Sequence, residues 1–190
     1  YASAFESDAA EVQALAEELV AHGALYTTHL HTEFDAILEA MQEAYDVGAH
    51  ARVPVIISHL KCAGAGNWGR SREVLASLDT AGRRLPVGCD CYPYAASSST
   101  LDLKQVTSDF DIDITWSTPH PEMAGRTLAE IAADWNLPLL QAARRLQPAG
   151  AVYHGMDEAD VQRILAHERT MIGSDGLPND PLPHPRLWGT

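Results

Sequence analysis

The sequence is poor in positive charge and has no long apolar segment. Lys and Arg together number 13 against 26 Asp and Glu, which gives a formal net charge of −13. A nucleic-acid-binding protein needs a basic face for the phosphates, so this balance argues against that role. No apolar run approaches the roughly 20 residues that span a bilayer, and the first residues do not have the basic-then-apolar pattern of a secretory leader, although a signal could precede them. We therefore expect a soluble protein that acts on small molecules rather than on nucleic acid or membranes.

Cysteine is scarce as well. The chain has Cys62, Cys89 and Cys91, an odd number without a CxxC pair, which argues against a disulfide framework and a thiolate zinc finger. Reduced thiols and a cytoplasmic location are the expectation. Cys89 and Cys91 alternate along a predicted strand, so their side chains share a face. We interpret them as small core residues, the alternative being a role as ligands.

Predicted strands and helices alternate along the chain. The strands are expected at residues 24–30, 53–58, 86–92, 151–153 and 170–174. The helices are expected at residues 8–22, 34–48, 70–83, 126–146 with a break near Pro138, and 158–167. This order predicts right-handed βαβ units and a parallel sheet, either doubly wound or part of a barrel. Segments 97–99 and 177–185 are expected to be loops.

Polar side chains follow several of these strands. His29, His59 and Asp175 each come directly after an apolar or β-branched run. The carboxyl ends of parallel strands meet at one edge, where ligands bind, so we expect the three side chains to lie close together. Imidazoles and a carboxylate suit zinc, and a catalytic zinc keeps one position open for water. The pattern therefore predicts a hydrolytic metal site, although a single His in such a place is often structural.

Four segments of the sequence carry a family resemblance: TTHLHTEFDAILEAM, IISHLKCAGAGNWGRS, CDCYPYAASSSTLDL and MIGSDGLPNDPLPHPRLWGT. Together they resemble the N-acyl-D-amino-acid deacylases (D-aminoacylases) of the amidohydrolase superfamily. The likeness runs over essentially the whole chain. It implies an α/β fold, an incomplete (β/α)8 TIM-like barrel holding about the fifth to eighth strands. We expect residues 1–190 to be part of that catalytic barrel, with both ends cut and the N-terminal strands and a small β-sandwich domain elsewhere.

The resemblance also implies roles for the three strand-end residues. His29 and His59 would be zinc ligands at the ends of the fifth and sixth strands. Asp175 would stand beside the metal at the end of the eighth strand and carry a proton from water to the leaving amine. The first-strand His-x-His pair and the bridging Cys of the family would precede this chain. None of the three cysteines here is expected to take the place of that Cys.

Further residues match family positions that contact the substrate. Tyr92 would donate a hydrogen bond to the oxyanion, the alternative being a packing aromatic. Lys61 and Arg186 would bind the α-carboxylate of the substrate, with Ser98 as a weaker candidate. A solvated loop charge is the alternative for Arg186. His31 stands where members commonly carry Arg, which leaves the substrate preference open.

The function implied by the resemblance is zinc-dependent hydrolysis of N-acyl-D-amino acids to a D-amino acid and a carboxylate. One alternative keeps the enzyme class and changes the substrate to a cyclic amide, as in hydantoinases and dihydropyrimidinases. The other is a non-catalytic piece with only a partial metal site. The sequence does not indicate an oligomeric state.

Overall fold

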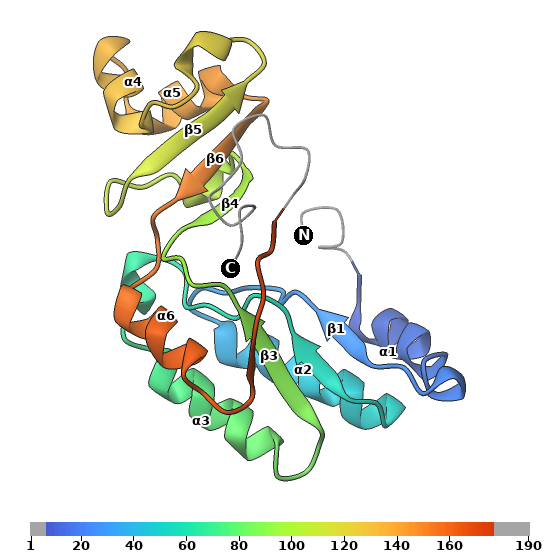
Figure 1. Ribbon diagram of the computed structural model, residues 1–190. Coiled ribbons are helices and arrows are strands. Elements are labelled where there is room, and N and C mark those ends of the chain that lie inside the picture. Colours follow the sequence, from blue (N-terminus) through green and yellow to red (C-terminus); the bar gives the residue numbers. More distant parts are fainter. Residues whose placement is uncertain (1–6, 177–190) are drawn as a thin grey trace. The chain divides into compact units, whose positions relative to one another are not determined.

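The computed structural model describes residues 7–176, which fall into two compact units (Figure 1). Among the described residues, the first unit comprises the chain up to Pro93 together with Asp157–Asp175. The second unit comprises Tyr94–Met156 and Gly176. Residues 94–156 are therefore an insertion, in sequence, between two parts of the first unit.

The first unit is built on a parallel sheet. Its strands are β1 (Tyr26–Thr28), β2 (Val55–Ile57), β3 (Val87–Cys91) and β7 (Thr170–Ile172), in the order β1-β2-β3-β7. One row of the register runs through Thr28, Ile57, Cys89 and Thr170. The predicted parallel sheet is thus confirmed for these four strands, each of which lies within its predicted range. The ends of the strands consequently meet at one edge, as the sequence analysis expected.

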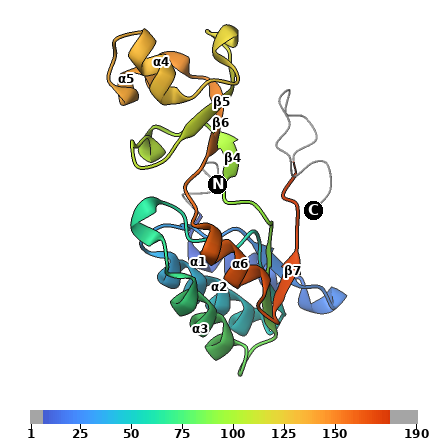
Figure 2. The same cartoon turned by 60° about the vertical axis from the view of Figure 1, so that its left-hand side comes forward.

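Helices cover one face of this sheet (Figure 2). They are α1 (Ala9–Glu17), α2 (Ile37–Ala51), α3 (Ser71–Ala81) and α6 (Glu158–Leu165), with short 3-10 turns η2 (Val20–His22) and η3 (Ala65–Asn67). The strand order follows the chain order, and right-handed crossovers that advance in one direction place their helices on the same side. The side chain of Asp8 caps α1 by accepting a hydrogen bond from the Glu11 N–H at 2.8 Å.

The core of the first unit lies between the helices and the sheet. Val55, Ile57 and Cys89 are fully buried on the strands, and Ile37 and Met41 are fully buried on α2. The burial of Val55 and Ile57 explains why the predicted strand at 53–58 is a continuous apolar run without polar alternation. Cys91 is buried too, so the interpretation of Cys89 and Cys91 as core residues is confirmed.

The second unit has an antiparallel sheet in the order β4-β6-β5. Its elements are β4 (Ser97–Thr100), η4 (Leu103–Gln105), β5 (Ile112–Ser117), η5 (Pro121–Met123), α4 (Leu128–Asp134), α5 (Leu139–Leu146) and β6 (Ala149–Tyr153). The expected break near Pro138 is confirmed, because α4 ends before it and α5 begins after it. Thr127 and Glu130 form a capping box at the start of α4. The unit has its own core, formed by residues such as Ile114, Ile131 and Leu146.

Two expectations about this region are wrong. The strand expected at 151–153 is present as β6, but it pairs antiparallel with β4 and β5 and does not join the parallel sheet. Residues 97–99, expected to be a loop, lie in β4. The serine-rich β4 lacks the apolar residues by which a strand is recognised, and only its pairing with β6 gives it a strand conformation. Segment 177–185 lies outside the described residues.

Across residues 7–176, no helix has both the length and the apolar composition that crossing a membrane requires.

Candidate metal site

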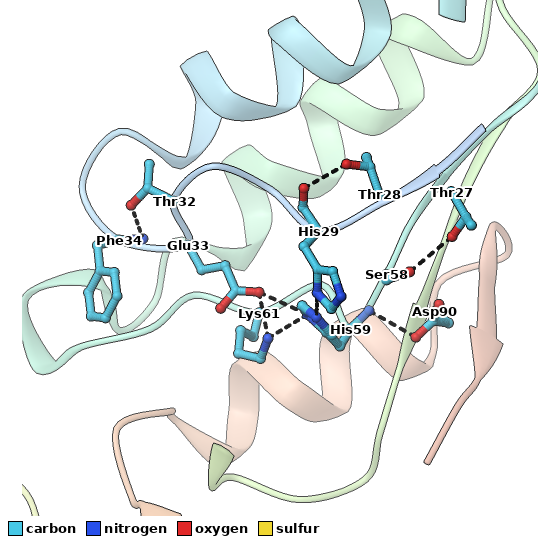
Figure 3. A network of polar contacts seen from close by, with 10 residues as sticks. All are labelled: Thr27, Thr28, His29, Thr32, Glu33, Phe34, Ser58, His59, Lys61 and Asp90. Carbon is cyan, nitrogen blue, oxygen red and sulfur yellow. Dashed lines mark hydrogen bonds and ion pairs between the residues drawn. The ribbon is translucent and has the colours of Figure 1, made fainter. Parts of the chain in front are cut away.

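The carboxyl-terminal edge of the parallel sheet gathers the predicted metal residues of the first unit. His29 directly follows β1, and His59 lies in the turn directly after β2. The two side chains point toward one another (Figure 3). The hydroxyls of Thr27 and Ser58 also meet between these strand ends, 3.0 Å apart. Neighbouring parallel strands have therefore brought together two imidazoles that are 30 residues apart in the sequence.

The two imidazoles converge through specific ring nitrogens. Nδ1 of His29 is in direct contact with Nε2 of His59, and the ring centres are 4.2 Å apart with planes inclined by 38°. Burial, and then the charge of His59, lower the pKa of His29. His29 is thereby kept in the neutral form that binds metals. Two nitrogen donors directed at the same point form a donor set of the kind that zinc takes in proteins.

The opposite side of the His59 ring contacts a carboxylate that the sequence analysis did not single out. Oε1 of Glu33 lies 2.8 Å from Nδ1 of His59 and 2.6 Å from Nζ of Lys61. Nζ of Lys61 is also 2.7 Å from Nδ1 of His59. Glu33 lies in the loop between β1 and α2, four residues after His29, and this position is the only sequence signal of its role.

The Glu33 carboxylate is charged at this place. Burial by itself would raise the pKa of Glu33, but the positive charge of Lys61 and the hydrogen bond from His59 lower it to about 2. The Lys61 side chain is only 6% exposed, so its ammonium group has exchanged most of its water for this carboxylate. A buried ammonium of this kind requires an acidic partner, and Glu33 supplies it.

Backbone conformation at the site is unusual. His59 and Asp175 adopt left-handed conformations with φ values of 42° and 49°, which are uncommon for residues other than glycine. The N–H of His59 donates a hydrogen bond to Oδ1 of Asp90 at 2.8 Å, and Asp90 belongs to β3. The left-handed turn of the chain directs the His59 ring back toward His29.

Asp175 contributes negative charge to the site. Its carboxylate is one of the charges that raise the pKa of His29, in opposition to burial. Between residues 7 and 176, no three His, Cys, Asp or Glu side chains gather closely enough to hold a metal ion. The predicted set of His29, His59 and Asp175 is thus a pair of imidazoles with a carboxylate within electrostatic range.

The predicted substrate-contact residues are distributed over the chain. Tyr92 directly follows β3 and is buried, and Nζ of Lys61 lies 5.6 Å from the centre of its ring. Ser98 belongs to β4 of the second unit. Arg186 lies outside the described residues. His31 forms an ion pair with Glu43, with its Nδ1 2.6 Å from the carboxylate.

The cysteines stay apart from this chemistry. All three are free thiols in the protein interior. Burial is the main cause that raises their pKa values, to about 12 for Cys62 and Cys91 and to about 11 for Cys89. A thiol in this state is a poor metal ligand, since the thiolate is the form that binds.

Comparison with known proteins identifies close relatives. No family model matches the chain. A curated N-acyl-D-glutamate deacylase from Alcaligenes xylosoxydans xylosoxydans is 49% identical over 185 residues, which are 97% of this chain and 38% of the relative. A D-aminoacylase from the same organism is 46% identical over 190 residues, which are 100% of this chain and 39% of the relative.

A solved structure of an N-acyl-D-amino-acid deacylase has a similar fold. N-acyl-D-glutamate deacylase from Bordetella bronchiseptica was crystallised with zinc and a phosphonate inhibitor that mimics the tetrahedral intermediate. It matches this chain with a TM-score of 0.91 and 47% identity, covering 96% of this chain and 39% of that one. The chain therefore spans about two fifths of the length of the proteins it matches. Over that part of their length, this chain is similar in sequence and in fold to the N-acyl-D-amino-acid deacylases, the D-aminoacylase family.

Proposed function

We propose that this chain carries part of the active centre of a zinc-dependent enzyme that hydrolyses N-acyl-D-amino acids to a D-amino acid and a carboxylate. The observation that carries the proposal is the convergence of His29 Nδ1 and His59 Nε2 at the carboxyl-terminal edge of the parallel sheet. The names of the relatives, at 46–49% identity, support the choice of substrate class.

His29 and His59 would hold the zinc ion. Zinc bound there supplies Lewis-acid polarisation of the scissile carbonyl and lowers the pKa of a water toward about 7. The remaining ligands belong to parts of the enzyme outside this chain. The lowered pKa of His29 suits this role because a neutral imidazole leaves a lone pair for the metal.

Other side chains would act directly on the substrate. Asp175 accepts a proton from the attacking water and delivers it to the leaving amine, and its charge near His29 supports that position. Tyr92 donates a hydrogen bond to the oxyanion. Lys61 and Arg186 bind the α-carboxylate, with Ser98 assisting.

The parallel sheet of the first unit would form one section of a (β/α)8 barrel. Its strand order, the helices on one face, and the chemistry at the carboxyl-terminal edge all suit that architecture. Met171 and Ile172 on β7 are 48% and 61% exposed, which suits a strand that gains another neighbour in the complete barrel. Assays should therefore use a full-length protein, in which this chain is accompanied by the segments that complete the length of its relatives.

The test is a zinc-reconstituted assay of the full-length protein with N-acetyl-D-methionine, N-acetyl-D-glutamate, N-acetyl-L-methionine and hydantoin. We expect amine release from at least one D-substrate, little from the L-substrate, and loss of turnover when a chelator removes zinc. The Asp175→Asn variant should retain zinc and lose nearly all turnover. Ring opening of hydantoin without cleavage of any N-acyl-D-amino acid would contradict the proposal.

A further inference from the structure

We propose that Glu33 is a positioning residue that holds the metal ligand His59 and the substrate-binding Lys61 on a single carboxylate oxygen. The proposal rests on the proposed function, in which His59 binds zinc and Lys61 binds the substrate. Oε1 of Glu33 lies 2.8 Å from Nδ1 of His59 and 2.6 Å from Nζ of Lys61 (Figure 3). One atom thus connects the side chain that faces the metal with the side chain that faces the substrate.

The first consequence concerns the tautomer of His59. A carboxylate only accepts hydrogen bonds, so the contact between Glu33 and Nδ1 of His59 requires a proton on that nitrogen. The Lys61 ammonium donates to the same carboxylate oxygen, and its approach to Nδ1 of His59 at 2.7 Å is then a contact between two donors that share one acceptor. With the proton on Nδ1, the lone pair of His59 is on Nε2. Nε2 is the atom that meets Nδ1 of His29. Glu33 therefore selects the tautomer that metal binding requires, as carboxylates hydrogen-bonded to metal-binding histidines generally do.

The second consequence concerns Lys61. Its ammonium group carries three N–H donors, and Glu33 accepts one of them. The side chain is almost fully buried, and its Nζ lies near the ring of Tyr92. Without Glu33, the ammonium would be buried beside the protonated edge of His59 with no acidic partner among these contacts. Glu33 therefore holds Lys61 in place, with donors left for a substrate carboxylate.

The main chain holds Glu33 firmly enough for this task. The N–H of Ala63, in the loop after β2, donates a hydrogen bond to the Glu33 carbonyl at 2.8 Å. The hydroxyl of Thr32 accepts a hydrogen bond from the N–H of Phe34 at 3.2 Å, and this bond shapes the turn around Glu33. The loops after β1 and β2 are thus joined at the residue whose side chain contacts both functional groups.

The experiment compares Glu33→Gln with wild type in the full-length protein. Gln keeps the size of the side chain and removes its charge. We expect zinc affinity, measured by competition with a chromophoric chelator, to fall by about 10–100-fold, the usual effect of losing a residue that supports a metal ligand. At saturating zinc, we expect KM for N-acetyl-D-methionine to rise by about tenfold or more, with a smaller change in kcat, because Lys61 contacts the bound carboxylate. The Glu33→Asp variant, which retains the charge, should recover part of both properties.

The matched control is Glu17→Gln. Glu17 also pairs with a histidine, since its carboxylate lies 2.7 Å from Nε2 of His50, but this pair is on an exposed part of α1 and α2. The control should leave zinc affinity and KM unchanged. A Lys61→Met background separates the two effects, because Glu33→Gln should then lower zinc affinity as before and add little to KM. If Glu33→Gln does not fold, the comparison is made with Glu33→Asp, whose shorter side chain should give a smaller loss of zinc affinity and a smaller rise in KM.

Two results would overturn the proposal. One is a folded Glu33→Gln variant whose zinc affinity and KM both equal those of wild type. The other is an equal loss of zinc affinity in Glu33→Gln and Glu17→Gln, which would indicate a general effect of charge. Failure of the proposed function is distinguishable, because a wild-type protein that binds zinc but cleaves no N-acyl-D-amino acid still reports the effect of Glu33 on zinc affinity.

Discussion

Oδ1 of Asp90 accepts a hydrogen bond from the backbone N–H of His59 at 2.8 Å, and through this bond strand β3 holds the turn after β2. The carbonyl of Asp90 accepts a second bond from the N–H of Leu60, also at 2.8 Å. His59 is in the left-handed conformation, with a φ of 42°. Asp90 therefore stabilises a backbone conformation that a residue other than glycine does not favour by itself.

The Asp90→Ala substitution should loosen this turn. We expect the free energy of unfolding to fall by about 1–3 kcal/mol, because the His59 N–H loses its acceptor, and we expect zinc affinity to fall as well. Asp90→Asn keeps an acceptor oxygen and should show smaller losses of both. Urea denaturation and chelator competition measure the two effects. An Ala variant that binds zinc as tightly as the Asn variant would show that the turn is held in another way.

Because His59 is in the left-handed conformation, we expect an unusual order of stability for two variants at this position. Both His59→Ala and His59→Gly remove the imidazole, so both should lose zinc binding. In the left-handed region glycine avoids the steric cost of Cβ, so the Gly variant should be more stable than the Ala variant by about 1 kcal/mol. The comparison is made by urea denaturation in the presence of a chelator. A more stable Ala variant would exclude a left-handed conformation at this position.

The buried thiols should resist modification. With pKa values raised to about 12, 12 and 11, Cys62, Cys91 and Cys89 remain protonated at pH 8 and should not react with iodoacetamide in the native protein. All three should react in guanidinium chloride, as mass-spectrometric peptide mapping can measure. Rapid labelling of any of the three under native conditions would contradict their burial.

The same thiols predict a loss of stability at alkaline pH. Their ordinary pKa of 9.0 applies to the unfolded chain, so above pH 9 the unfolded state binds fewer protons than the folded state. Their contribution is fully present below pH 9 and declines as the pH rises toward about 11 to 12. Urea midpoints at pH 8 and pH 10 should therefore differ, and replacing Cys89 with Ala should reduce the difference.

At Gly48, replacing glycine with alanine in a helix should lower the stability of the protein, where it would ordinarily raise it. Ala is a better helix former than Gly by about 1 kcal/mol, but a Cβ at position 48 of α2 would overlap Cγ2 of Val55 in β2. We expect Gly48→Ala to destabilise the protein by about 1–3 kcal/mol, the usual cost of overpacking a core. Gly66→Ala is the control, because a Cβ there meets nothing within 4 Å. The thermal midpoint measures both.

The same glycine shows the limit of local patterns at helix ends. The sequence predicted a helix at about residues 34–48, so that it would end at Gly48. The structure continues α2 to Ala51, and Arg52 adopts the left-handed conformation at its end with a φ of 58°. Gly48 is present because the helix must approach β2 closely, a requirement that no local pattern reveals.

Strand pairing was predictable only where the local pattern excluded other partners. The run that forms β2 is apolar, and helices separate it from the runs that form β1 and β3, so a parallel sheet was the natural arrangement. The run that forms β6 has the same character and the same helical neighbours, yet it pairs with β4 and β5. The polar β4 gives little sign of being a strand, so this pairing depends on contacts distant in the sequence.

The sequence by itself determined which residues stand at the strand ends. Two imidazoles and a carboxylate follow apolar runs there, and strand periodicity with the rule of parallel edges predicted that His29 and His59 would meet. Only the tertiary structure decided which nitrogens face each other, that His59 turns through a left-handed conformation held by Asp90, and that Glu33 connects His59 to Lys61. These features depend on hydrogen bonds between segments about 30 residues apart. Such bonds form only after packing has brought three strand ends together, so they leave no periodic signal in the sequence.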